Sequence, residues 1–178
     1  MNKPLPLRPT GCAVAIALAA AIGMAPAAAF GGLPLTKVAD VPLGGNTTRF
    51  DYASYDPVRH LLFIAHLGDS AVIVFDTRAQ RAIARIPDVS KVHGVLVIPR
   101  LGRLYASATG TNEVVAIDET SFRIMARIPG GAYPDGMAYA PGVHRLYVSD
   151  EYGDTDTVID VRSNALVATI PLGGEVGN

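Results

Sequence analysis

The sequence repeats itself at a fixed interval. The stretch "HRLYVSD" at 144–150 follows "GRLYASA" at 102–108 and "HLLFIAH" at 60–66, which defines a 42-residue repeat. Two further sets of anchors keep the same interval: the aspartates Asp76, Asp118 and Asp160, and the Ile-Pro pairs that begin at 86, 128 and 170. A period in the forties indicates a repeated supersecondary unit that buries its faces against near-copies of itself.

The content of each repeat indicates strands. The second repeat holds four short apolar runs, rich in Val, Ile and Tyr, at 94–98, 103–108, 113–118 and 123–128. Turn residues separate these runs, and none is long enough for the helices of a helical repeat. Four strands in a repeat of this length are typical of a propeller blade. The sequence therefore predicts an all-β fold, a β-propeller of four-stranded blades.

Three full blades are predicted, at about 50–92, 93–134 and 135–176. Residues 35–45 align with the fourth strand of a repeat, so we expect them to form the last strand of another blade. Propellers usually close with four to eight blades. The sequence therefore predicts either an N-terminal fragment of a larger ring or a chain that associates with copies of itself through an exposed blade face.

Residues 1–29 have the pattern of a secretory signal peptide. Two basic residues precede an uncharged apolar run at 11–24, and the small residues Ala27 and Ala29 follow it. This pattern predicts cleavage after Ala29, a propeller segment at 30–178 and a periplasmic or secreted protein. The apolar run is too short to cross a bilayer comfortably, so we expect no membrane span after cleavage.

Cysteine and charge narrow the chemistry further. Cleavage would remove Cys12, the single cysteine of the sequence, which would leave a mature chain without a disulfide. The formal net charge of the whole chain is −1. The loops on one end of the blades carry most of the arginines, which leaves a nucleic-acid-binding face as an alternative. The net acidity of the chain argues against it, so we expect no nucleic-acid partner.

The third repeat resembles the YVTN-type β-propeller repeat of YncE-like exported bacterial proteins. The matching residues are the turn Gly131, Pro134 and Gly136, the Leu-Tyr-Val of 146–148 and the Thr-Val-Ile-Asp of 157–160. The first and second repeats depart from the turn pattern, with "TTRFDY" and "VSKVHG" in its place. The resemblance covers about residues 36–178 and implies a seven-bladed ring. It implies little about activity, because propellers host many functions.

One register of polar residues is a candidate site. We call the loops that enter the first strand of each blade, and those that join its second and third strands, the top face. The other loops form the bottom face. Asp51, His93 and Asp135 occupy the same position of the three repeats, at the start of the innermost strands, where we expect them to ring the central channel. Asp and His are metal-ligand types, so a divalent cation is a candidate ligand there. Their alternative role is to cap the exposed first residue of each strand.

Two more residues complete the predicted site. His66 and Asp150 share a second register, at the top end of the second strand, where they could form an outer shell. The loops of the top face are predicted to be mostly acidic, which would concentrate cations or basic partners there. The alternative is that these loops carry solvated charges and bind nothing.

The leading functional prediction is an exported binding scaffold without catalysis of its own. Its partner would be an unknown protein or a small polar ligand, bound on the top face at the channel mouth. The sequence contains no G-x-S-x-G elbow, H-E-x-x-H motif or P-loop, and no cofactor is evident. The blade type is also similar to that of lactonases and quinoproteins. The resemblance therefore implies an alternative, a metal-dependent hydrolase or a quinoprotein-type oxidoreductase domain.

Overall fold

The structure is a computed structural model that describes residues 35–176. The chain divides into two units, 1–37 and 38–178. Of the first unit the structure describes residues 35–37, which form neither strand nor helix. The predicted signal peptide, 1–29, lies outside the described residues. All the described strands belong to the second unit, and no helix in the described part of the chain is long and apolar enough to cross a membrane.

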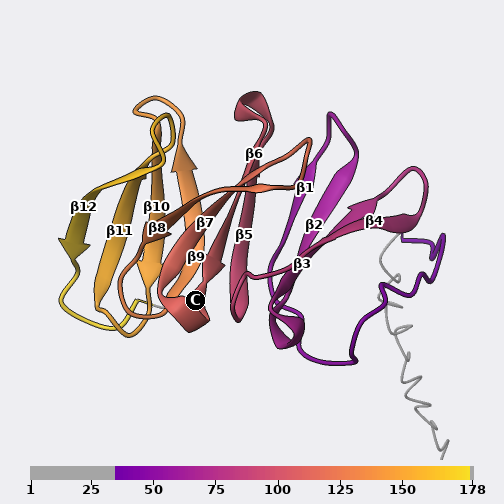
Figure 1. Cartoon of the computed structure of the whole chain (residues 1–178), viewed down its shortest axis with the longest axis horizontal. Helices are drawn as coiled ribbons and strands as arrows, with labels where there is room; N and C mark the ends of the chain where they lie inside the picture. The colour runs from indigo at the N-terminus through magenta and orange to yellow at the C-terminus, as the bar shows by residue number, and fades with distance from the viewer. Residues whose placement is uncertain (1–34, 177–178) are drawn as a thin grey trace, which may run out of the picture. The chain divides into compact units, whose positions relative to one another are not determined.

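The second unit contains three four-stranded antiparallel sheets, each with its strands in chain order (Figure 1). The first sheet comprises β1 (Ala53–Asp56), β2 (Leu61–His66), β3 (Ala71–Asp76) and β4 (Arg81–Ile86). The second comprises β5 (Val92–Ile98), β6 (Arg103–Ala108), β7 (Glu113–Asp118) and β8 (Ile124–Pro129). The third comprises β9 (Pro134–Ala140), β10 (Arg145–Asp150), β11 (Thr155–Asp160) and β12 (Ala165–Pro171). The predicted all-β fold with one four-stranded sheet in each repeat is confirmed.

The backbone repeats as regularly as the sequence. Three hairpin positions have a left-handed backbone in every sheet, with φ between 51° and 60°. They are His60, Gly102 and His144; Ser70, Asn112 and Asp154; and Gln80, Phe122 and Asn164. Non-glycine residues seldom adopt this conformation, so its recurrence in every repeat shows that the same tight turns are built three times.

The recurring aspartates bind backbone groups of these turns. Asp76 Oδ1 accepts hydrogen bonds from the backbone N–H groups of Arg78 and Ala79, at 2.8 Å each. Asp118 and Asp160 bind the corresponding backbone N–H groups of their own turns. These backbone hydrogen bonds hold the pKa of all three carboxyls below the usual value, against the opposing effect of desolvation. Their role is therefore to close the turn after the third strand of each sheet.

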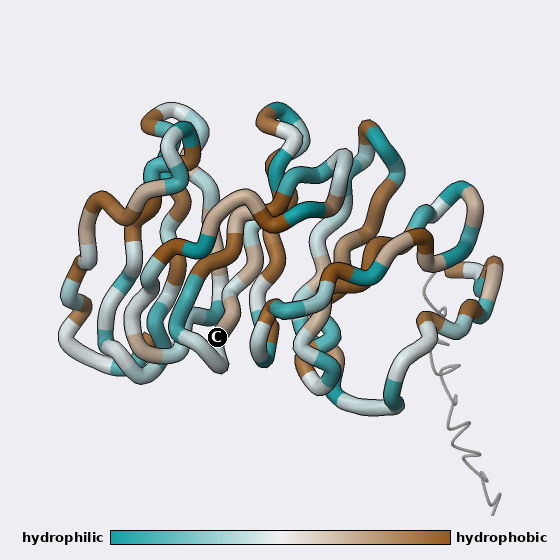
Figure 2. The backbone as a smooth tube through the Cα atoms, viewed as in Figure 1, coloured by the Kyte–Doolittle hydropathy of each residue, from teal (hydrophilic) through white to brown (hydrophobic). Residues whose placement is uncertain are grey.

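The second sheet is buried on both faces. Alternate residues of β6 point to opposite sides, so Leu104 packs toward the first sheet and Tyr105 toward the third. We call the interface of the first and second sheets the first joint, and that of the second and third sheets the second joint. Leu146 and Val148 of β10 are buried in the second joint, as the alternation predicts. Figure 2 shows that hydrophobic stretches run along the strands that form these joints.

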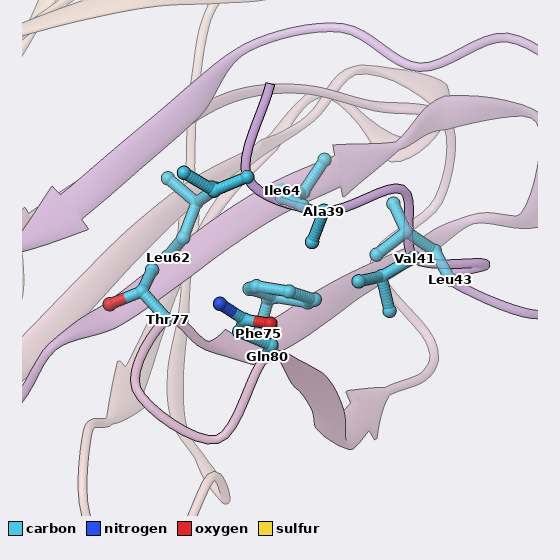
Figure 3. A pocket seen from close by; sticks show the side chains of 9 residues that line it. Ala39, Val41, Leu43, Leu62, Ile64, Phe75, Thr77 and Gln80 are labelled. Carbon is cyan, nitrogen blue, oxygen red and sulfur yellow. The ribbon is translucent and has the colours of Figure 1, made fainter. Parts of the chain in front are cut away.

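The outer face of the first sheet carries an apolar groove of about 370 Å³ (Figure 3). Leu62, Ile64 and Phe75 form the floor of the groove, and the segment 38–43 forms its wall. The structure assigns no strand to residues 35–45, where a last strand of another blade was predicted. A fourth strand hydrogen-bonds to the third strand of its own blade, and among the described residues no such strand lies beside this segment.

Candidate binding site on the top face

The three predicted channel-mouth residues lie at the start of the innermost strands. Asp51 lies two residues before β1, whereas His93 and Asp135 are the second residues of β5 and β9. β5 begins two residues earlier than predicted, and its pairing with β6 shifts register between Val92 and Val95. His93 therefore belongs to the strand itself.

Two of these residues, Asp51 and His93, lie next to each other. His93 Nε2 lies 4.0 Å from Asp51 Oδ2, and Arg49 binds the same carboxylate oxygen at 2.9 Å. Gly94 allows the third residue to lie close by, because a Cβ at this position would lie 2.2 Å from the carbonyl oxygen of Asp135. The start of β5 can therefore approach the start of β9 this closely only because residue 94 is a glycine.

The hydrogen bonds of His93 define the roles of its two ring nitrogens. Nδ1 lies 2.9 Å from the carbonyl oxygen of Lys91, which can only accept, so Nδ1 carries a proton. Nε2 lies 3.1 Å from the hydroxyl of Tyr133. In the neutral ring, Nε2 therefore accepts the Tyr133 proton, and the imidazole is fixed at both ends.

An aromatic row leads from this histidine toward solvent. The ring centroids of His93 and Tyr133 are 5.1 Å apart, and those of Tyr133 and Tyr152 are 4.3 Å apart. The Glu151 N–H donates to the carbonyl of Tyr133 and the Tyr152 N–H to that of Ala132, so two loops of the third sheet hold the row in place. Tyr152 is 65% exposed and forms the outer end. The top face thus presents ring faces beside carboxylates.

Carboxylates act on two tyrosines of this region. Burial raises the pKa of Tyr52, and the charges of Asp135, Asp51 and Glu151 raise it further. Burial also raises the pKa of Tyr133, with contributions from the neighbouring Tyr152 and Glu151. Asp135 and Glu151 contribute to both shifts because a negative charge disfavours the phenolate, so these carboxylates act on both tyrosines.

The predicted outer-shell residue His66 binds the loop that enters β1. Its ring is fully buried and stacks on Phe50, with centroids 4.1 Å apart and planes 12° apart. Nε2 lies 3.0 Å from the Thr48 hydroxyl, and Nδ1 lies 3.6 Å from Asp69 Oδ2. These contacts fix the loop that carries Asp51, which makes His66 a support of the site.

The second predicted outer-shell residue, Asp150, is also fully buried. Oδ1 accepts the N–H of Gly131 at 3.0 Å, and Oδ2 accepts the hydroxyls of Thr155 and Thr157 at 2.9 and 2.8 Å. These partners come from the loop that enters β9 and from β11. Asp150 therefore joins two segments of the third sheet.

The candidate metal ligands already contact other groups. Within residues 35–176, no three His, Cys, Asp or Glu side chains are grouped so that they could hold a metal ion. The closest atoms of Asp51 and His93 are shared with Arg49 and Tyr133. The arrangement offers hydrogen bonding, negative charge and aromatic faces.

Sequence reasoning did not identify the two tyrosines of the aromatic row. Tyr152 lies in the acidic loop "DEYGDTD" at 150–156, and the equivalent positions of the second and first repeats are Gly110 and Gly68. An aromatic residue that replaces a repeated glycine was the available signal. Tyr133 shares its register with Lys91, and both have a left-handed backbone. Nothing in the spacing indicated that its ring would contact His93.

Comparison with known proteins identifies the fold. No protein-family profile and no curated protein matches the sequence. Among solved structures, hydrazine synthase of Kuenenia stuttgartiensis aligns with a TM-score of 0.66 and 20% identity over 83% of this chain and 40% of that chain. U3-55K and the WD40 repeats of RRP9 each align with a TM-score of 0.64 and 19% identity over 72% of this chain. Those alignments cover 41% and 40% of the matched chains.

These likenesses establish the fold alone. The three sheets are blades of a β-propeller, as the sequence repeat predicted. The chain spans about two fifths of the length of the three structures it matches.

Proposed function

We propose that the chain belongs to an exported YVTN-type β-propeller that acts as a binding scaffold, without catalysis of its own. We further propose that its top face binds a basic segment of a partner protein. The WD40 repeats among the structural neighbours support a scaffold role, because repeat folds present extended binding surfaces. The exported location rests on the signal-peptide pattern of residues 1–29.

The observation that carries the ligand class is the aromatic row beside the carboxylates. The ring centroids of Tyr133 and Tyr152 lie 4.3 Å apart with the rings tilted by 37°, and Glu151 and Asp135 act electrostatically on Tyr133. Lys and Arg side chains bind over tyrosine rings, an interaction worth about 0.5–2 kcal/mol, and they pair with carboxylates in charge-assisted hydrogen bonds. A basic side chain of a partner would therefore find both kinds of contact on one surface.

A peptide-binding measurement tests the ligand class. Fluorescence anisotropy would compare the full chain with a labelled Arg/Lys-rich peptide and with a Glu-rich peptide of the same length. We expect the basic peptide alone to bind, with an affinity that falls as salt is added. Tyr152→Ala should weaken binding by roughly tenfold, because it removes the exposed ring.

The matched control is Tyr55→Ala, which removes another exposed tyrosine, 45% exposed, from the first sheet. This change should leave peptide binding unaltered. Equal binding of the acidic peptide, or unchanged affinity in Tyr152→Ala, would contradict the proposed ligand class.

Export is tested independently of binding. The protein would be recovered from the cell envelope and its N-terminus determined by mass spectrometry. A mature chain that begins at Phe30 supports the proposal, whereas a chain that retains the apolar run at 11–24 contradicts it.

A further inference from the structure

The first joint contains three charged side chains on the bottom side of the sheets. Arg59, in the turn after β1, lies 3.3 Å from Asp56 Oδ2 and 3.1 Å from Glu119 Oε2. Asp56 ends β1 in the first sheet, whereas Glu119 follows β7 in the second. We call these residues the first-joint triad. It connects two sheets through one cation and two carboxyl groups.

Both carboxyl groups of the triad are removed from water. The side chains of Asp56 and Glu119 are 0% exposed, whereas that of Arg59 is 38% exposed. Asp56 also accepts the N–H of Val58 at 2.7 Å. Glu119 Oε1 is buried and accepts no hydrogen bond within the described part of the chain. If both carboxyls were ionised, one arginine would face two buried negative charges, and one charge would remain uncompensated.

The fold itself does not require charges at these positions. The equivalent residues one repeat later, which hold the same register at the second joint, are Ile98, Leu101 and Val161. Ile98 and Val161 are buried in the apolar core there. The second joint thus closes with apolar side chains where the first joint buries a triad. The triad occurs at one of two equivalent positions, so the packing of repeated sheets does not by itself explain it.

We propose that the first joint is closed by a shared proton: Glu119 holds the proton and donates it to Asp56 while the sheets are packed together, and its loss loosens the joint. In the closed state, ionised Asp56, protonated Glu119 and Arg59 sum to zero charge. In the deprotonated state, the joint holds one uncompensated negative charge. Water must then enter, or the two sheets must separate at this edge.

The acidity of the two carboxyls fits this arrangement. Burial raises the pKa of Glu119 to about 7, and the hydrogen bond with Asp56 and the charges of Asp56 and Asp118 add to the effect. The positive charge of Arg59 lowers the pKa of Glu119 and so opposes these effects. Burial alone would raise the pKa of Asp56, but hydrogen bonds with Glu119, Val58 and Arg59 hold it below the usual value.

The sign of the pH dependence follows from these directions. The pKa of Glu119 is raised above its ordinary value of 4.5. Its stabilising contribution is therefore whole below pH 4.5 and is lost as pH rises through about 7. The contribution of Asp56 has the opposite sign and changes only in more acidic solution, below its ordinary value of 3.8. Between pH 5 and 8 the joint responds to Glu119.

One backbone hydrogen bond reports on the closed joint. Val97 of β5 donates its N–H to Ser54 Oγ of β1, at 3.0 Å, across the first joint. Hydrogen exchange of this amide, followed by NMR on the full chain from pH 5 to 8 and corrected for intrinsic exchange, measures opening. We expect its protection to fall by about 100-fold over this range and then to level off. Amides of β10 in the third sheet should keep their protection.

The matched variant is Glu119→Gln, which imitates the neutral acid. We expect Val97 protection in this variant to be independent of pH and equal to that of the wild type at pH 5. A pH-dependent fall in the variant would overturn the proposal. So would constant protection in the wild type, or an equal fall in β10, which would place the proton's effect on the whole chain. If Glu119→Gln does not fold, the wild-type comparison of Val97 with β10 decides.

Discussion

The two joints are formed by equivalent strands in the same register. Their polar groups nevertheless lie at different positions. The first joint holds the triad of Asp56, Arg59 and Glu119, whose counterparts in the second joint are apolar. The second joint holds Arg103, Tyr105 and Asn164, whose counterparts in the first joint are Leu61, Phe63 and Phe122. Each joint is therefore polar where the other is apolar.

The chemistry of the two polar groups also differs. In the second joint, Tyr105 donates to Asn164 Oδ1 at 2.7 Å, and Arg103 donates to the same oxygen at 3.1 Å and to the carbonyl of Val161. These acceptors are neutral, so no proton has to be shared. Burial raises the pKa of Tyr105, which therefore stays a donor through the neutral range. The register decides which positions face a joint, whereas the individual residues decide whether it responds to pH.

Transplanting one joint into the other has the largest expected effect. Arg59→Leu introduces the counterpart Leu101 and leaves two buried carboxyls without their cation, so we expect a loss of about 3 kcal/mol in unfolding free energy at pH 6. Adding Asp56→Ile and Glu119→Val completes the apolar set of the second joint. The triple variant should regain most of the loss, because burying apolar groups avoids the desolvation of charges.

Urea unfolding of the wild type, the single variant and the triple variant measures both effects. A triple variant that is less stable than Arg59→Leu would show that the two joints differ in backbone shape as well as in side chains. The two joints would then not be equivalent.

Exchanging the aromatic residues has an intermediate effect. Tyr105→Phe imitates Phe63 and removes a buried hydrogen bond to Asn164, which should cost about 1 kcal/mol. The reverse change, Phe63→Tyr, places a hydroxyl in the fully buried first joint and should cost about 1–3 kcal/mol. Thermal or urea unfolding of the two variants would check this order. A stabilising Phe63→Tyr would mean that the first joint already holds a hydrogen-bond partner for the hydroxyl.

The turn positions give the smallest effect. His144 and Gly102 hold the same left-handed position, with φ of 56° and 60°. Because glycine adopts this conformation without strain, His144→Gly should raise the unfolding free energy by about 0.5–1 kcal/mol. His60→Gly should gain less, because it also loses the 3.1 Å contact of His60 with the Tyr55 hydroxyl. Equal gains in urea unfolding would show that this contact contributes nothing.

The fold could be predicted well from the sequence because each repeat packs against a near-copy of itself. Equivalent positions of the repeats must satisfy the same neighbours, so alternation within β6 and β7 was enough to place these two strands to the residue. The segment 35–45 was less predictable. Its similarity to a fourth strand is real, but a strand forms only beside a partner, and the described residues offer it the side-chain groove of Leu62, Ile64 and Phe75 instead.

The candidate site was predictable only in part. The register placed Asp51, His93 and Asp135 at equivalent positions, since the strand starts are fixed by the repeat. Side-chain partners are set by loops that differ between repeats. For that reason the sequence did not reveal that Tyr133 binds His93, or that Asp150 is occupied by Thr155 and Thr157. The prediction of a ligand at this face remains to be tested.

The exchange of polar positions between the joints also affects how the chain assembles. Near-identical sheets can dock on the wrong neighbour during folding, a known failure of repeat proteins. If the first sheet docked on the third, Asp56 would meet Val161 where it now meets Glu119. Its buried carboxylate would then lack the proton that Glu119 donates. The loss of this hydrogen bond destabilises the wrongly docked pair of sheets. The triad and the Tyr105–Asn164 contact are each satisfied only between the correct pair of sheets. They therefore favour packing of the blades in their order along the chain.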